Sequence, residues 1–325
     1  LIIKSDGIGF EDELEKRRIQ YKKLHIELSP YKLKFYQSAF ELMNLLLKNN
    51  IRIIYANNED LSSLVAVIRI LSLFYFKTKL HIRNTPQYFD FYKKLMFLHN
   101  DIICNSNYTR KTLLKDIHFY NRKKLHIVPN AHGQIKKNAI LQFKNYKNYF
   151  LSVGMICERK AQLDVVKTFT ENDLLESAQY LMIGKTNEKN IYQSNIEETI
   201  KKYRLEGKIF LIPFIRDLCS AYSNAIATIV PSNNETFGRV VIESGFYGTP
   251  VIVRNIEPLS ELVVHKKTGL IWDGSSHHLT KLLSSLIKDN ELRNTLGANL
   301  KETVMKEYTN KNYQSKLKSI ISGNL

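Results

Sequence analysis

The chain has 325 residues, of which 44% are hydrophobic and 24% charged, and its formal net charge is +17. This size and balance are ordinary for a globular protein with two domains, each with its own core. The three cysteines, Cys104, Cys157 and Cys219, form no C-x-x-C pair. This argues against a zinc site or a disulfide framework and fits a reducing cytoplasm.

The positive charge is concentrated in the first half of the chain. Residues 1–150 contain 26 Lys and Arg against 12 Asp and Glu, a net +14, whereas the remainder contains 22 against 19, a net +3. The asymmetry predicts a cationic surface whose partner is an anionic membrane, an anionic lipid-linked substrate or a nucleic acid. A general preference for Lys throughout the protein is the alternative. It explains the high total charge better than it explains the uneven distribution of that charge.

Short apolar runs predict strands in the first half at residues 1–5, 20–26, 51–57, 79–84, 101–106 and 124–130. The longest apolar run, Leu61–Phe76, has 16 residues and includes Arg69. A membrane span needs about 20 apolar residues, so we expect a buried helix, capped within Asn57–Asp60. The polar residues 133–149 are typical of a linker.

The second half alternates strands and helices more regularly. Strands are expected at 149–154, 179–184, 208–213, 227–232, 250–255 and 269–274, and helices at Leu163–Phe169, Asn195–Tyr203 and Arg239–Phe246. Strands without polar alternation are covered on both faces, as in parallel sheets. The sequence therefore predicts an α/β protein with two doubly wound, Rossmann-like domains facing a cleft. Ligands of such sheets bind beyond the carboxyl ends of the strands.

One such carboxyl end is followed by the loop NNETFG and by a helix from Arg239. The N–H groups near Phe237, Gly238 and Arg239 would form an anion site, and Gly238 would let a phosphate approach the backbone. Helical side chains lean toward the helix start, so the Glu243 carboxylate would reach a ribose beside the phosphate. Glu235 would meet a sugar hydroxyl or a developing positive charge. Two surface glutamates are the plainer alternative.

The stretch PSNNETFGRVVIESGFYGTPVIV, residues 231–253, resembles the signature P-S-x-x-E-x-F-G-x-x-x-x-E-A-x-A-x-G-x-P-V-V of retaining glycosyltransferases of family 4. These enzymes have the GT-B fold. The similarity extends through FLSVGMICERKAQLDVVKTF, YLMIG, DIICNSNYTRKTL and LHIVPNAHG. It implies an acceptor domain at 1–146, a donor domain at 147–308, and a final helix at about 309–325 that returns to the first domain.

The resemblance assigns the donor side residue by residue. Glu243 would bind the ribose hydroxyls of a nucleotide sugar, and Glu235 would contact its sugar beside the backbone of Phe237, Gly238 and Arg239. Lys160 stands at the family's diphosphate-binding lysine. Further donor-side assignments are Gly154 at a strand end and Arg216 near the base. The family's usual arginine at that strand end is replaced by Met155 in this sequence, and the guanidinium of Arg159 would bind the phosphate in its place.

The acceptor-side candidates are Arg83, Asn84, His81 and Asn130. His81 is better interpreted as an ordinary strand residue. The family's first strand and glycine-rich loop have no counterpart here, since DGIGF at 6–10 is interpreted as a turn after the second strand. We therefore expect an N-terminal segment to be missing.

The implied reaction transfers a sugar to an acceptor hydroxyl with retention of configuration, in surface-glycan assembly such as lipopolysaccharide or capsule. The chain has no D-x-D motif, so we expect a metal-independent, hexosyltransferase-type enzyme with no cofactor. A glycan or lipid-linked acceptor and a cytoplasmic position, peripheral on the inner leaflet, fit the basic half. A non-catalytic scaffold subunit and a basic nucleic-acid-binding protein are the alternatives, although no nucleic-acid-binding signature is present.

Overall fold

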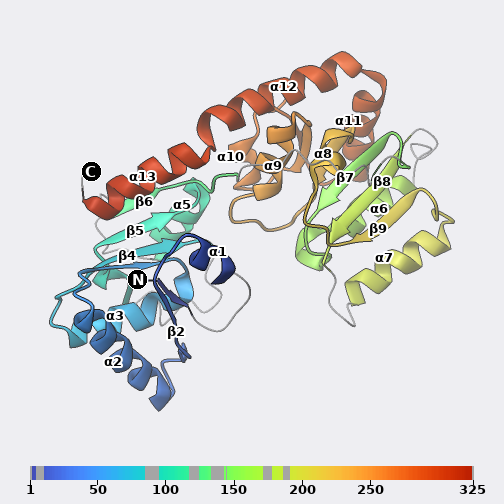
Figure 1. Ribbon diagram of the computed structural model, residues 1–325. Helices are drawn as coiled ribbons and strands as arrows, with labels where there is room; N and C mark the ends of the chain where they lie inside the picture. The colour runs from blue at the N-terminus through green and yellow to red at the C-terminus, as the bar shows by residue number, and fades with distance from the viewer. Residues whose placement is uncertain are drawn as a thin grey trace. The chain divides into compact units, whose positions relative to one another are not determined.

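The computed structural model describes residues 2–4, 11–84, 95–116, 124–132, 143, 145–170, 178–185 and 191–323. The contacts divide the chain into two compact units (Figure 1). The first comprises residues 1–105, 109–127 and 319–325, and the second comprises 106–108 and 128–318. The chain passes to the second unit after Ile127, earlier than the expected boundary at 146. Most of the expected linker, and the turn expected at 6–10, lie outside the described residues.

The second unit is built on a six-stranded parallel sheet in the order β12-β11-β10-β7-β8-β9. The chain winds outward from β7 in one direction and then from β10 in the other, so the topological switch lies between these two strands. In doubly wound sheets the ligand binds at this switch, beyond the carboxyl ends. The strands are β7 (Tyr149–Val153), β8 (Gln179–Gly184), β9 (Ile209–Pro213), β10 (Ala227–Val230), β11 (Val251–Arg254) and β12 (Leu270–Trp272).

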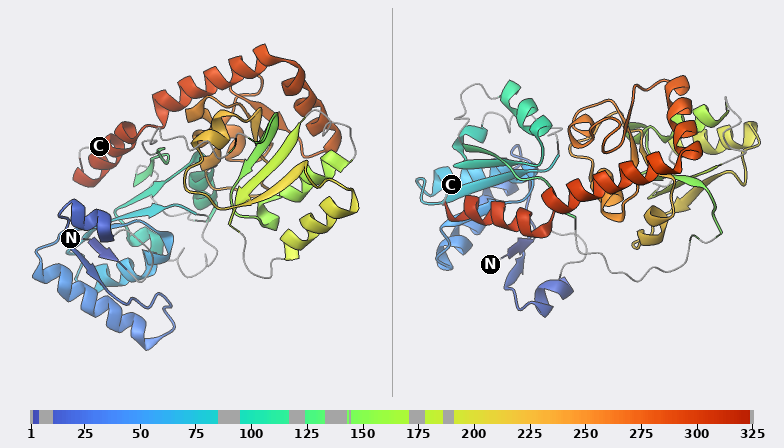
Figure 2. Two further views of the ribbon diagram at one scale, coloured as in Figure 1. Left: turned by 45° about the vertical axis from the view of Figure 1, so that its right-hand side comes forward. Right: turned by 90° about the horizontal axis from the view of Figure 1, so that it is seen from above.

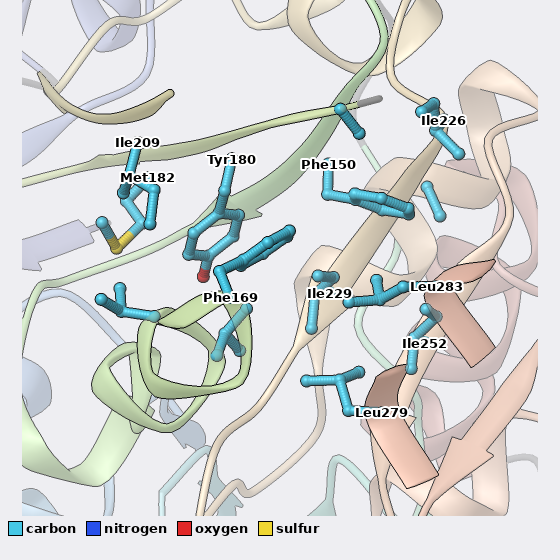
Figure 3. Close-up of a cluster of buried hydrophobic side chains, with 14 of the residues drawn as sticks. Phe150, Phe169, Tyr180, Met182, Ile209, Ile226, Ile229, Ile252, Leu279 and Leu283 are labelled. Carbon is cyan, nitrogen blue, oxygen red and sulfur yellow. The ribbon is translucent and has the colours of Figure 1, made fainter. Parts of the chain in front are cut away.

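Helices cover this sheet and bury its core (Figure 2). They are η4 (Glu158–Lys160), α6 (Gln162–Thr170), α7 (Ile191–Lys202), α8 (Cys219–Ser223), α9 (Arg239–Tyr247), α10 (Leu259–Leu262), α11 (Ser276–Lys288) and α12 (Asn290–Glu307). The last helix, α13 (Asn310–Ser322), crosses the division between the units, since residues 319–325 group with the first. Figure 3 shows Phe150, Phe169 and Tyr180 packed between strands and helices. The buried Tyr180 hydroxyl donates to Ser152 Oγ at 2.8 Å, so its polar end is satisfied.

Helix α9 is held against α12 at very short range. A Cβ added to Gly245 would lie 2.7 Å from Leu300 Cγ and 2.7 Å from Val304 Cγ2. Only a residue without a side chain allows this approach, because a Cβ contact below 3 Å forces a shift of the neighbour. The packing fixes the axis of α9 and therefore the direction in which its N-terminus points.

The first unit has a four-stranded parallel sheet in the order β3-β4-β5-β6 and a separate parallel pair, β1-β2. Its core lies between this sheet and the pair α2 and α3. The elements are β1 (Ile2–Lys4), α1 (Glu11–Lys16), β2 (Tyr21–Lys23), α2 (Leu33–Lys48), β3 (Ile53–Ala56), η1 (Glu59–Leu61), α3 (Ser62–Leu71), β4 (Lys77–Ile82), η2 (Met96–Leu98), β5 (Asp101–Cys104), α5 (Asn107–Asp116) and β6 (Leu125–Ile127).

All twelve predicted strands are present. The long apolar run forms the buried helix α3, which follows a turn capped by the Asn58 side chain. The helix ends at Leu71, before the apolar run does, because Leu73 and Phe74 turn the chain in the left-handed conformation. Within the described part of the chain, no helix has both the length and the apolar character of a membrane span.

Candidate functional site

At the end of β7 the backbone packs closely against the end of β8. Gly154, with φ 143°, donates its N–H to the carbonyl of Ile183 at 2.9 Å. A Cβ on Gly184, at the end of β8, would lie 1.7 Å from the Gly154 carbonyl oxygen. A Cβ added to Gly154 would point toward Lys160, whose Nζ would lie 4.0 Å from it. The Lys160 ammonium therefore lies directly beside the end of β7.

Lys160 is ion-paired with Glu235, a residue 75 positions later in the chain. The Ser232 hydroxyl donates to the same carboxylate oxygen at 3.0 Å. The Lys160 and Glu235 side chains are 15% and 10% exposed, so solvent screens the pair less than a surface ion pair. The structure thus brings together two residues that the sequence assigned to the diphosphate and to the sugar.

Arg159 adds a second cation beside this pair. Its Nη1 donates to the carbonyl of Asn234 at 3.0 Å and lies 4.0 Å from Glu235 Oε2. The Asn233 N–H in turn donates to the Arg159 carbonyl at 2.9 Å. The loop that carries Glu235 and the turn that carries Lys160 are therefore tied together. The Arg159 side chain is 51% exposed, so it is accessible to an anion.

Helix α9 begins at this loop. Gly238 is its N-cap with φ 90°, and a Cβ there would lie 2.7 Å from Leu259 Cδ2. Both the backbone conformation and the space require glycine. The Phe237 side chain is buried against Tyr308, with ring centroids 6.1 Å apart, so the backbone rather than this side chain is what the loop offers a ligand. The first N–H groups of α9, from Arg239 onward, supply a partial positive charge.

Glu243 lies one turn into α9, and its carboxylate is held at both oxygens. The Tyr222 hydroxyl donates to Oε2 at 2.8 Å, and Arg239 Nη2 lies 3.3 Å from Oε1. Burial, together with the negative charge of Glu243, raises the pKa of Tyr222 well above its usual range, so the hydroxyl stays a donor. The contact to Arg239, four residues earlier, shows the expected lean toward the helix start.

His132, Tyr222 and Arg254 are part of these surroundings although the sequence did not indicate them. The His132 ring centroid lies 4.9 Å from that of Phe246, and the backbone N–H of His132 donates to the Tyr308 carbonyl at 3.1 Å. Burial lowers the pKa of His132, while the charge of Glu243 opposes that shift. Asn130, two residues earlier, is partly buried.

Arg254, at the end of β11, holds the loop that carries Glu235 through a hydrogen bond to Asn233. Its guanidinium bonds to Asp164 of α6 and to Asn233 of the loop, and lies 4.5 Å from the centroid of the Trp272 ring. No single stretch of sequence reveals this role, because it depends on β11, α6 and the loop meeting in space. Arg216 is exposed in the segment between β9 and α8.

In the first unit Arg83 and Asn84 follow the end of β4. The buried Glu59 accepts hydrogen bonds from their N–H groups at 3.1 and 3.4 Å through Oε2, and the Arg83 guanidinium donates to Asn57 Oδ1. No pattern in the sequence indicated the role of Glu59. These contacts fix the backbone of the two acceptor-side candidates.

His81 is fully buried within β4, as its interpretation as a strand residue requires. Its Nδ1 lies 2.6 Å from the Tyr55 hydroxyl. Burial and the nearby charge of Arg83 lower the pKa of His81 to about 3, so the ring is neutral at physiological pH.

Residues 134–303, slightly more than half of the chain, match the family model described as glycosyl transferases group 1. The chain belongs to this family. CapM of Staphylococcus aureus, a capsular polysaccharide biosynthesis glycosyltransferase, is 27% identical over 174 residues, which are 52% of this chain and 44% of CapM. The O-antigen chain mannosyltransferase RfbU of Salmonella typhimurium is 26% identical over 183 residues, 55% of this chain and 49% of RfbU.

This group 1 glycosyltransferase thus matches about half the length of those relatives. Its fold is similar to that of HepE from Anabaena, solved in complex with UDP and glucose, with a TM-score of 0.83 over 98% of this chain and 91% of HepE. The two sequences are 14% identical, so the likeness concerns the fold. The predicted GT-B fold is confirmed. Among the described residues, no three His, Cys, Asp or Glu side chains are grouped to hold a metal ion, and metal independence stays a prediction.

Proposed function

We propose that this chain transfers a sugar from a nucleoside-diphosphate sugar to an acceptor hydroxyl, with retention of configuration. The observation that carries the proposal is the partly buried Lys160–Glu235 pair beside Gly154, at the switch of the sheet and next to the start of α9. A cation and a helix N-terminus at one strand edge suit a diphosphate. Membership of the group 1 family supports this assignment.

The donor would be held along α9 and at the end of β7. Glu243, oriented by Tyr222 and Arg239, would accept from the paired ribose hydroxyls. The diphosphate would take the place of Glu235 as the partner of Lys160, with Arg159 beside it. Glu235 would then be released toward the donor sugar. Arg216 is the proposed neighbour of the base.

Catalysis would rest on stabilising the leaving diphosphate. Negative charge grows on its oxygen as the bond to the anomeric carbon breaks, and Lys160, Arg159 and the α9 N-terminus are oriented before the reaction begins. The acceptor hydroxyl forms the new bond on the same face, and its proton passes to the departing diphosphate. We propose no side-chain nucleophile, metal ion or cofactor for this step.

The acceptor would be a glycan or lipid-linked glycan contacting Arg83 and Asn84, in the assembly of a bacterial surface polysaccharide. The names of CapM and RfbU support the pathway class. The enzyme would work in the cytoplasm, where nucleotide sugars are available as donors.

The test is a thermal-shift screen with UDP, GDP, ADP and CMP on the parent and on Glu243→Gln. A ligand at 100 times its Kd stabilises by about 2.7 kcal/mol, a shift of several degrees. We expect one nucleoside diphosphate to stabilise the parent and the Glu198→Gln control, whose carboxylate is exposed on α7, but not Glu243→Gln. Stabilisation of all three proteins alike would contradict the role of Glu243.

The corresponding nucleotide sugar then separates enzyme from scaffold. Transfer to an acceptor, or slow hydrolysis that is lost in Lys160→Met, supports catalysis. Tight binding with neither reaction favours the scaffold alternative.

A further inference from the structure

Exposed large apolar side chains are concentrated in the first unit, although it is the smaller of the two. Of the 19 such side chains in the described part of the chain, 13 lie between Ile19 and Phe97. Most belong to α2 and to the turn between α3 and β4. We call these the apolar face, defined by Leu33, Tyr36, Phe40, Leu47, Leu71, Leu73, Phe74 and Tyr75.

Helix α2 carries two apolar stripes. Phe35, Ala39, Leu42 and Leu46 are buried in the cluster shared with α3, and this stripe is sufficient to attach the helix. The second stripe, at Leu33, Tyr36, Phe40 and Leu47, repeats every three to seven residues on an adjacent side and is exposed. Figure 1 shows α2 along the outer side of the first unit, beside α3. A helix that only packed on α3 would carry polar residues at the second stripe.

The turn before β4 presents apolar side chains in an unfavourable backbone conformation. Leu73 and Phe74 have φ of 50° and 63°, where Gly or Asn is usual, and they are 88% and 55% exposed. Hydrogen bonds from Phe74 N–H to the Arg69 carbonyl and from Tyr75 N–H to the Ser72 carbonyl define the turn. The Phe74 ring centroid lies 5.2 Å from the Arg69 guanidinium carbon, yet the side chain remains more than half exposed. A tight turn that exposes two bulky apolar side chains favours a contact outside this unit.

Basic residues accompany the apolar face. Residues 31–53 and 69–77 contain six Lys and Arg and one acidic residue, Glu41. The Arg52 guanidinium lies 5.6 Å from the Tyr75 ring centroid, and the Lys77 N–H donates to the Arg52 carbonyl, so the end of α2 and the turn adjoin. Lys48 and Lys77 are exposed in the same region.

We propose that the apolar face binds the surface of a lipid bilayer rich in anionic headgroups. Aliphatic side chains with interfacial tyrosines would enter the boundary between headgroups and acyl chains, and the lysine and arginine heads would remain at the phosphates. The Lys and Arg residues around the apolar face favour an anionic bilayer over an uncharged apolar protein surface. Each lysine or arginine held near anionic headgroups adds to the attraction between protein and bilayer. The apolar face belongs to the first unit, whereas Lys160, Glu235 and α9 belong to the second. The inference therefore goes beyond the proposed function and can fail independently of it.

The test is flotation of the purified protein with two kinds of vesicle, phosphatidylcholine alone and phosphatidylcholine mixed with phosphatidylglycerol. We expect binding to the anionic vesicles, weakened at least tenfold in the double variant Leu73→Asn with Phe74→Asn. Asparagine tolerates positive φ, so this variant keeps the turn. Lys48→Glu combined with Arg52→Glu should weaken binding about tenfold or more, with a strong dependence on salt.

The matched control is Tyr203→Asn with Val264→Asn, which removes two exposed apolar side chains from the second unit. It should bind as the parent does. No binding to anionic vesicles, or binding that is the same for parent, turn variant and control, would overturn the proposal. So would self-association in sedimentation that the turn variant abolishes, because the face would then serve a second copy of the chain. A turn double variant with glycine in place of asparagine relieves the backbone strain. If its thermal midpoint is that of the parent, loss of its binding is due to the missing apolar side chains and not to unfolding.

Discussion

Tyr222 and Glu243 form a hydrogen bond of 2.8 Å between two helices, α8 and α9, that the sequence separates by a strand. The Tyr222 ring stacks on Tyr247 with centroids 5.4 Å apart and planes 10° apart, so its hydroxyl has a fixed direction. Tyr222 is therefore a positioning residue for the proposed ribose-binding carboxylate.

Tyr222→Phe should keep the stacking and lose the orientation of Glu243. A hydrogen bond to a charged group contributes about 1.5–3 kcal/mol, so nucleoside-diphosphate affinity should fall roughly tenfold or more. Calorimetric titration measures this, with the exposed Tyr203→Phe as control. An unchanged Kd would show that Glu243 needs no support from Tyr222.

The Lys160–Glu235 pair should show coupling in a double-mutant cycle. Lys160→Met leaves a carboxylate that is 10% exposed without its cation and should lower the free energy of unfolding by about 2 kcal/mol. Glu235→Gln on its own should cost less, and the double variant should cost less than the sum of the two. Urea denaturation of all four proteins checks this. Additive effects would mean that the ion pair contributes no interaction energy.

Gly238→Ala should destabilise the second unit more than a left-handed glycine alone explains. The methyl group would lie 2.7 Å from Leu259, so we expect a loss of about 2–4 kcal/mol in the free energy of unfolding. Gly207→Ala is the matched control, since its φ is 80° and no atom lies within 4 Å of the added Cβ. It should cost about 1 kcal/mol. Equal losses would show that the packing against α10 is unimportant.

His81 should make the first unit less stable in acid. Burial, and then the charge of Arg83, lower its pKa from 6.5 to about 3 in the folded state, so below pH 6.5 the unfolded chain binds a proton that the folded chain does not. The contribution of the buried neutral His81 to the free energy of unfolding is complete above pH 6.5 and is lost progressively as the pH falls toward 3. The free energy of unfolding should decrease by up to about 1.4 kcal/mol per pH unit from this group.

Denaturation curves measured between pH 6.5 and pH 3 test this with His81→Gln. Its free energy of unfolding should fall less steeply with decreasing pH than that of the parent, by up to about 1.4 kcal/mol per pH unit. His277→Gln, which replaces an exposed histidine on α11, is the control substitution. His99 has a pKa lowered to about 4, chiefly by burial, and so contributes in the same direction in every one of these proteins. Identical slopes for His81→Gln and the parent would contradict a buried neutral His81.

The strands were predictable because parallel strands are buried on both faces and read as continuous apolar runs, as at 179–184 and 227–232. Glu235, Glu243 and Lys160 were assigned through a family resemblance carried by short stretches of sequence, and their roles stay predictions. Tyr222, Arg254, Glu59 and His132 were not, because each acts through residues that only the fold brings near it.

Arg254 connects the proposed donor site to a natural optical probe. Trp272 is the sole tryptophan in the sequence, it is fully buried, and the guanidinium stacked on it also holds Asn233 in the Glu235 loop. A shift of that loop should move the guanidinium relative to the indole ring and change the emission of the protein. We therefore expect intrinsic fluorescence to follow donor binding to the proposed site in real time and without a label.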